Sequence, residues 1–212
     1  MKYGRTTDDL IRELATRPAP APFHPAVAGA GMLATLVFAM GIFLFAFGVR
    51  ADLAAAWVHV PVQAKTVLPV LLSVAAAWLA LRSARPEGRV SLWPLALPAG
   101  LALLLFANRL VTTDGPRLAE AFGQTATACL VSITLLSAFP LAAGVLYLRR
   151  AAPTRPVLTG ALLGIAVGAG VASGYALHCT EDSPLFFVAW YGLGIGLVGG
   201  VGAYLGHRFL RW

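Results

Sequence analysis

The chain has 212 residues, of which 58% are hydrophobic and 12% are charged, and its formal net charge is +7. Soluble domains are about half apolar and about a quarter charged, so this composition indicates a membrane protein with no length left for a large catalytic domain. The positive charge could suggest nucleic-acid binding, but the basic residues fall between hydrophobic runs, where they orient a membrane protein. We therefore expect neither an enzyme nor a protein that contacts nucleic acid directly.

Residues 1–25 form a separate leader that is first polar and then rich in proline. Thr6 and Asp9 have the spacing of a helix capping box, which predicts that a helix begins here. Asp8 and Asp9 also suit the positive end of the helix dipole. Acidic residues this early are atypical of a cleavable signal, so we expect the first hydrophobic run to remain as an anchor.

Three apolar residues of the leader, Leu10, Ile11 and Leu14, recur at helical spacing and form one stripe. A helix of about ten residues is marginal alone in water, so we expect it to become ordered on a partner. The alternative is a frayed leader whose leucines rest on the bilayer surface. The prolines that follow predict the end of the helix and an extended tether; they are Pro18, Pro20 and Pro22.

Residues 26–212 contain six hydrophobic runs and are expected to form one all-α, six-span transmembrane domain. A span needs about 20 apolar residues, and the shortest run should borrow flanking residues 62–65. No Asp, Glu, Lys, Arg or His lies inside the runs, which argues against a proton-driven transporter. The runs are 26–49, 66–81, 90–107, 125–148, 157–177 and 185–206.

The distribution of basic residues predicts the orientation of these spans. Six spans place both termini on one side, together with the segments after the second and fourth runs. That side holds twelve Lys and Arg residues, and the opposite side holds four. Because cytoplasmic segments are enriched in Lys and Arg, we expect both termini in the cytoplasm and the segment with Cys179 outside.

Glycine recurs at every fourth position in each of the last two runs. Such ridges let helix backbones approach closely, so we expect these two spans to pack as a tight hairpin through both ridges. The alternative is that glycine is simply common in these runs. The ridges are Gly160, Gly164 and Gly168 in the fifth run, and Gly192, Gly196 and Gly200 in the sixth.

The protein has two cysteines, Cys129 and Cys179, which the topology places in the outer third of the bundle. His178 stands next to Cys179, and thiolate and imidazole are both metal ligands. A three-ligand metal site of Cys129, His178 and Cys179 and a redox pair are equally compatible with this pattern. The alternatives are that each cysteine is an ordinary small apolar residue and that His178 only caps the fifth span. Asp182 or Ser183 as the N-cap, followed by Pro184, is a good helix start.

Three stretches resemble the NrsF-type anti-sigma factors, six-span membrane proteins of bacteria. The family usually has proline where this chain has Thr180, a minor departure beside the second cysteine. The stretches are residues 7–15 (TDDLIRELA), residues 178–187 (HCTEDSPLFF) continuing into Trp190 and Tyr191, and residues 208–212 (RFLRW).

This resemblance implies an inner-membrane protein whose leader, including Asp8, Asp9 and the apolar stripe, holds an extracytoplasmic-function sigma factor. It also implies that Cys129 and Cys179 sense oxidants or heavy metals, with no cofactor beyond a transient metal ion at the pair. Two other hypotheses remain. The cysteine pair could handle metal or electrons directly in a membrane transport or redox protein, or the chain could be a passive membrane scaffold.

Overall fold

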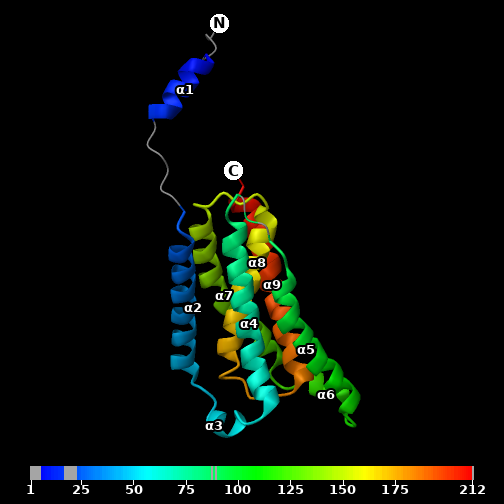
Figure 1. The fold of residues 1–212 in the computed structure, drawn as a ribbon. Coiled ribbons are helices and arrows are strands. Elements are labelled where there is room, and N and C mark those ends of the chain that lie inside the picture. The colour runs from blue at the N-terminus through cyan, green and yellow to red at the C-terminus, as the bar shows by residue number, and fades with distance from the viewer. Residues whose placement is uncertain (1–5, 17–22, 87, 89, 212) are drawn as a thin grey trace.

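A computed structural model describes residues 6–16, 23–86, 88 and 90–211 (Figure 1). The predicted proline tether lies outside these residues. The described helices, in chain order, are α1 (Thr7–Thr16), α2 (Pro25–Phe47), α3 (Leu53–Ala56), α4 (Val60–Ser83), α5 (Trp93–Thr112), α6 (Arg117–Phe122), α7 (Ala126–Leu148), α8 (Pro156–Tyr175) and α9 (Pro184–Phe209).

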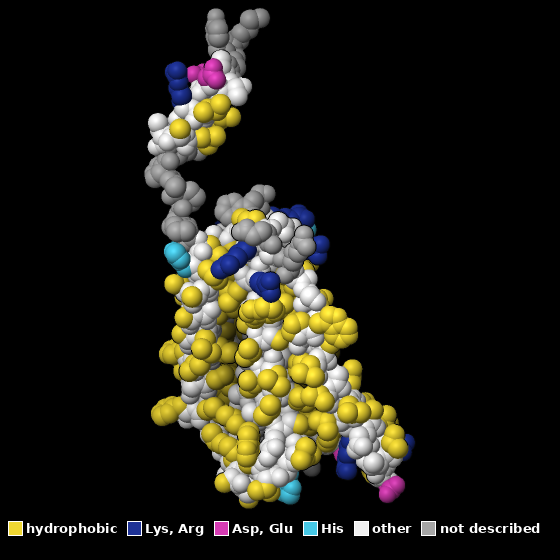
Figure 2. All heavy atoms as spheres, viewed as in Figure 1, with side chains coloured by type: hydrophobic (Ala, Val, Ile, Leu, Met, Phe, Trp, Pro, Cys, Tyr) yellow, Lys and Arg dark blue, Asp and Glu magenta, His cyan; other side chains and the backbone are white. Residues whose placement is uncertain are grey.

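Six helices of the described chain, α2, α4, α5, α7, α8 and α9, are long and apolar enough to cross a membrane. This confirms the predicted all-α architecture and the number of spans. They form one elongated bundle, with α1 standing apart from it (Figure 1). Hydrophobic side chains cover the visible face of the bundle between its two ends, as expected for a surface in contact with lipid (Figure 2).

The two ends of the bundle differ. The start of α2 and the end of α9 lie at one end, which we call the terminal end, and Lys and Arg side chains gather there (Figures 1 and 2). The short helices α3 and α6 lie at the other end, which we call the loop end (Figure 1). The segment between α8 and α9, with Cys179, also lies at the loop end.

Helix α8 is the most buried of the six spans and α5 the least. α8 packs against α9, α4, α7 and α2, whereas α5 packs against α4 and α9 only among the stronger helix pairs. The core of the bundle therefore forms around α8.

The predicted glycine ridge of α8 lies in its interface with α9. A methyl group on Gly164 would overlap the carbonyl oxygen of Val198 and lie 2.8 Å from Gly199 Cα. Gly160 and Gly168 likewise face the backbone of α9. Gly160 and Gly164 need glycine because the two backbones meet there directly, whereas an added methyl on Gly168 would make a tight contact, 3.2 Å from Ile195 Cα.

The predicted ridge of α9 was wrong. A Cβ atom on Gly192, Gly196 or Gly200 would meet nothing within 4 Å. The α9 side of the interface instead includes Gly202 and Gly206, where an added methyl would overlap the carbonyl oxygens of Gly160 and Pro156. Two stripes of α9 carry glycines four residues apart, and α8 packs against the one with Gly202 and Gly206.

The second span includes the flanking residues 62–65 that the short run was expected to borrow, and this determines the chemistry of the bundle. α4 starts at Val60, with Pro61 in its first turn, where the missing N–H of proline is harmless. Lys65 therefore lies inside the helix and is completely buried. The apolar run itself holds no ionisable residue, but the flanking residues that it borrows bring Lys65 into the span.

Candidate functional site

The segment between α8 and α9 leads into α9 through a helix cap. The Ser183 hydroxyl accepts a hydrogen bond from the Leu185 N–H at 3.2 Å, and Pro184 follows at the first helical position. This confirms the predicted start of the sixth span. The same hydroxyl donates to Glu120 Oε1 of α6 at 2.6 Å, so the cap also ties the segment to α6.

The structure brings the two cysteines into one buried cluster. Cys129 lies in the first turn of α7 and is 0% exposed, and Cys179 follows α8 and is 4% exposed. Both are free thiols. They share the cluster with Tyr175 and Tyr191. Two residues 50 positions apart in the sequence are thus enclosed in one apolar environment.

His178 is held by α2. Its Nδ1 atom lies 2.9 Å from the Gly48 carbonyl oxygen, and its ring packs edge-on against Phe43 and Phe47. Within the part of the chain that the structure describes, no group of three or more His, Cys, Asp or Glu side chains is arranged to hold a metal ion. Cys129, His178 and Cys179 therefore do not form a ready three-ligand site in this arrangement.

Two cations that the sequence reasoning did not assign to the site converge on the residues after α8. Lys65 Nζ donates to the Cys179 carbonyl oxygen at 2.6 Å, to the Glu181 carbonyl oxygen at 3.2 Å and to Asp182 Oδ1 at 2.6 Å. Arg50 Nη1 donates to the same Cys179 oxygen at 3.3 Å. The usable signal in the sequence was Lys65 itself, next to an unusually short apolar run.

Arg50 also forms a bidentate ion pair with Asp182, with contacts of 2.7 and 3.1 Å. A further pair to Asp52 lies at 2.8 and 2.9 Å. The hydrogen bonds that Arg50 donates to Asp52, and then those that it donates to Asp182, raise the pKa of Arg50. Burial alone would raise the pKa of Asp182, but the hydrogen bonds from Arg50 and Lys65 outweigh burial and hold that pKa below its ordinary value. Asp182 is therefore ionised at neutral pH.

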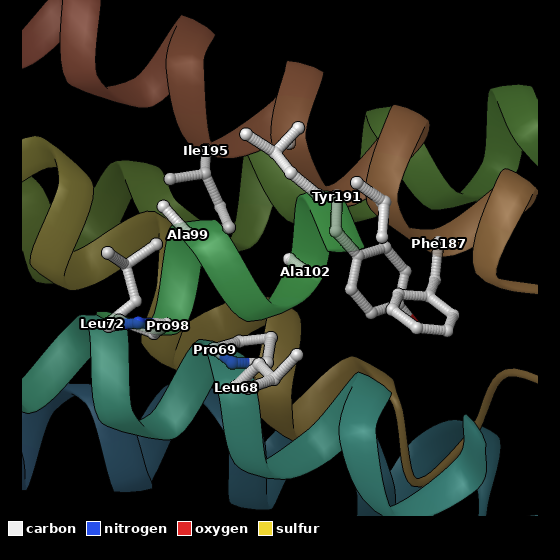
Figure 3. A pocket seen from close by; sticks show the side chains of 12 residues that line it. Leu68, Pro69, Leu72, Pro98, Ala99, Ala102, Phe187, Tyr191 and Ile195 are labelled. Atoms are coloured by element: carbon white, nitrogen blue, oxygen red, sulfur yellow. The ribbon is translucent and has the colours of Figure 1, made fainter. Parts of the chain in front are cut away.

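Two pockets adjoin the cysteine cluster. One, of about 320 Å³, lies at the loop end and is lined by Arg50, Tyr175, His178 and Cys179 among others. Cys179 thus forms part of the wall of this pocket. The other, of about 270 Å³, lies between α4, α5 and α9. Figure 3 shows its lining, which is apolar and shares Tyr191 with the cysteine cluster.

The leader helix α1 has the predicted cap. The Thr6 hydroxyl donates to Asp9 Oδ2 at 2.6 Å and accepts from the Asp9 N–H at 3.3 Å. The side-chain and backbone hydrogen bonds from Thr6 lower the pKa of Asp9. None of the residues of α1, all of them described, is buried. Leu10, Ile11 and Leu14 are 47%, 58% and 57% exposed, so the apolar stripe is open to a partner.

These features define a multi-pass membrane protein with a buried thiol pair near one end and an exposed amphipathic helix beyond the other. A family model described as NrsF, negative regulator of sigma F, matches residues 14–212. The chain is 34% identical to the anti-sigma-F factor NrsF of Caulobacter vibrioides, over 97% of this chain and 99% of that protein. It is 33% identical to the probable anti-sigma-F factor NrsF of Azospira oryzae, with the same coverage. The chain belongs to the NrsF family. No solved structure gives a significant match.

Proposed function

We propose that this protein is an anti-sigma factor of the bacterial inner membrane. Its leader holds a sigma factor of the extracytoplasmic-function type inactive, and the thiol pair controls release. Membership of a family described as negative regulators of sigma F supports the proposal. The structural observation that carries it is the free-standing α1, whose exposed apolar stripe has no cover from the bundle (Figure 1).

The proposed orientation follows from charge. The terminal end carries most of the Lys and Arg residues and is assigned to the cytoplasm under the positive-inside rule. A sigma factor is cytoplasmic, so the leader must be there to reach it. The loop end, with Cys179 and its pocket, then faces the oxidising side of the membrane, where thiols meet oxidants and metal ions.

The leader is suited to docking in a groove. Leu14 lies four residues after Leu10 and three after Ile11, and these are spacings that anchors have in helix-in-groove complexes. Full burial of such a side chain contributes about 1.5–3 kcal/mol, and roughly half of each is still exposed here. The three side chains together thus supply about 2–4 kcal/mol, and Asp8 and Asp9 can add contacts to basic groups on the partner.

Replacing both leucines tests this docking. In Leu10→Asp/Leu14→Asp, the lost apolar contacts and the burial of two carboxylates should weaken sigma-factor binding by at least about 100-fold. Sigma-dependent transcription in the host should become constitutive. Arg12→Gln/Thr16→Asp is a matched control, because it changes the net charge by the same amount on the opposite face of α1. Repression that survives the leucine changes would exclude α1 as the docking element.

The thiol pair is tested by single substitutions. Thiolates react with oxidants and bind heavy metals, so Cys129→Ser and Cys179→Ser should each keep the sigma factor bound when the host is treated with oxidant or heavy metal. Cys129→Ala and Cys179→Ala are companion variants that separate loss of the thiol from burial of a hydroxyl. Continued release by both single serine variants would refute the sensor role.

A further inference from the structure

Lys65 is the most unusual residue of the bundle, because it is a fully buried cation inside a membrane-spanning helix. Ionisable side chains at such positions are rare and mark functional sites by default. Its three hydrogen bonds all go to residues 179–182: two backbone carbonyl oxygens and the Asp182 carboxylate. The ammonium is therefore satisfied only while this segment keeps its present position.

Arg50 holds the same segment from the other side. Its guanidinium reaches the Cys179 carbonyl and grips Asp182 with two hydrogen bonds. Its backbone N–H donates to the Leu177 carbonyl at 3.0 Å. Two cations, one from α4 and one from the connection between α2 and α3, thus converge on one carbonyl oxygen and one carboxylate.

This arrangement links Cys179 to the far end of the bundle through α4. Lys65 lies near the start of α4, and Ser83 ends the helix at the terminal end. There, Arg82 stacks over Trp78 at 4.9 Å. Both line a pocket with Pro25, the first residue of α2, to which the leader is joined. A shift of α4 at the loop end would therefore reach the attachment point of the leader.

We propose that Lys65 and Arg50 are positioning residues that latch the Cys179 segment against α4 and the α2–α3 connection. The closed latch is the state in which the leader retains the sigma factor. Opening of the latch is the step between the thiol pair and the leader. This inference rests on the proposed function for its output, but the latch itself has a readout that needs no sigma factor.

The latch explains why the segment needs charge and not only packing. A buried ammonium that loses its partners is strongly unfavourable. A small displacement of residues 179–182 is therefore opposed until the cation and α4 move with it. The latch therefore has two states, closed and open. Elements with two discrete states can convert a small local displacement, here of residues 179–182, into a larger rearrangement of the protein.

The test is Lys65→Met in the full-length protein in host membranes, because methionine keeps the length of the side chain and removes the charge. Without inducer, the amount of sigma factor that co-purifies should fall at least tenfold. The fall should persist in the triple variant with Cys129→Ser and Cys179→Ser, because the latch acts after the thiols. The rate of Cys179 labelling by a maleimide should rise at least tenfold in Lys65→Met, which keeps both thiols.

Two further variants separate the latch from general damage. Lys65→Arg retains the cation and should retain the sigma factor. Arg109→Met removes the exposed ion pair to Glu120, which is 2.7 Å long and lies at the same end, and should behave as the unmodified protein in both assays. Where Lys65→Met fails to accumulate, Asp182→Asn keeps the two carbonyl contacts of Lys65 and should raise the labelling rate by a smaller factor.

Unchanged labelling and sigma-factor recovery in Lys65→Met would overturn the latch, as would equal loss in Lys65→Arg and Lys65→Met. If Asp182→Asn is used because Lys65→Met does not accumulate, an unchanged labelling rate in Asp182→Asn would also overturn the latch. These outcomes differ from a failure of the proposed function, in which the unmodified protein itself recovers no sigma factor. In that case, the rate of maleimide labelling still shows whether Lys65 holds the Cys179 segment in place.

Discussion

The interface between α8 and α9 makes a sharp prediction about two glycines. Gly164 faces the backbone of α9, where an added methyl would overlap the Val198 carbonyl oxygen and lie 2.8 Å from Gly199 Cα. Gly196 on α9 has nothing within 4 Å of the same added atom. Gly164→Ala and Gly196→Ala are therefore the same chemical change in two opposite environments.

The magnitude follows from two opposing effects. Overpacking a tight contact costs about 1–3 kcal/mol, and the obstructing atoms at Gly164 are backbone atoms that cannot rotate away. Replacing glycine by alanine within a helix stabilises the helix by up to about 1 kcal/mol. We expect Gly164→Ala to be destabilising by about 1–2 kcal/mol, a factor of about 5–30 in the ratio of folded to unfolded protein. Gly196→Ala should be neutral or stabilising by up to about 1 kcal/mol.

Reversible unfolding of the purified protein in mixed micelles measures both variants against the unmodified chain. The expected order of stability is Gly196→Ala, then the unmodified protein, then Gly164→Ala. Equal effects of the two substitutions, or a larger loss in Gly196→Ala, would refute the assignment of the α8–α9 interface.

Two further predictions concern the segment between α8 and α9. The pKa of Asp182 is lowered in the folded protein from an ordinary value of 3.8, so its stabilising contribution is complete above that value and is lost as the pH falls through the lowered pKa. Unfolding curves at decreasing pH should show this loss below about pH 4, and Asp182→Asn should show one titrating group fewer; an unaltered pH dependence in that variant would contradict the ion-pair assignment. Ser183→Ala removes the cap of α9 and should lower the free energy of unfolding by about 1 kcal/mol, whereas no change in unfolding would show that the cap is not stabilising.

Much of the fold could be predicted because it depends on local pattern. Six apolar runs are visible in the sequence whatever their packing, and helix starts at Thr6 and Ser183 depend on side chains that bond to backbone groups two or three residues away. The position of both cysteines near the same end of the bundle also followed from topology, since Cys129 begins a span and Cys179 follows one. Their enclosure in one buried cluster did not.

The parts that could not be predicted depend on distant partners. The sequence predicted that residues 62–65 extend the second span, but it did not predict that Lys65 is completely buried there. Its burial is tolerated only because residues 179–182, more than 110 positions away, supply its acceptors. The face of α9 that meets α8 is a similar case. Spacing identifies a stripe of small residues, but it does not say which of two glycine-rich stripes finds a partner.

The central claim is that the leader of this membrane protein retains a sigma factor. The most direct measurement is co-purification of the tagged protein from its own host in mild detergent, with residues 1–22 present or deleted. The account predicts a sigma factor with the full chain and none after the deletion. A full chain that recovers no sigma factor would contradict the account and leave direct metal or redox transport by the cysteine pair as the function to test.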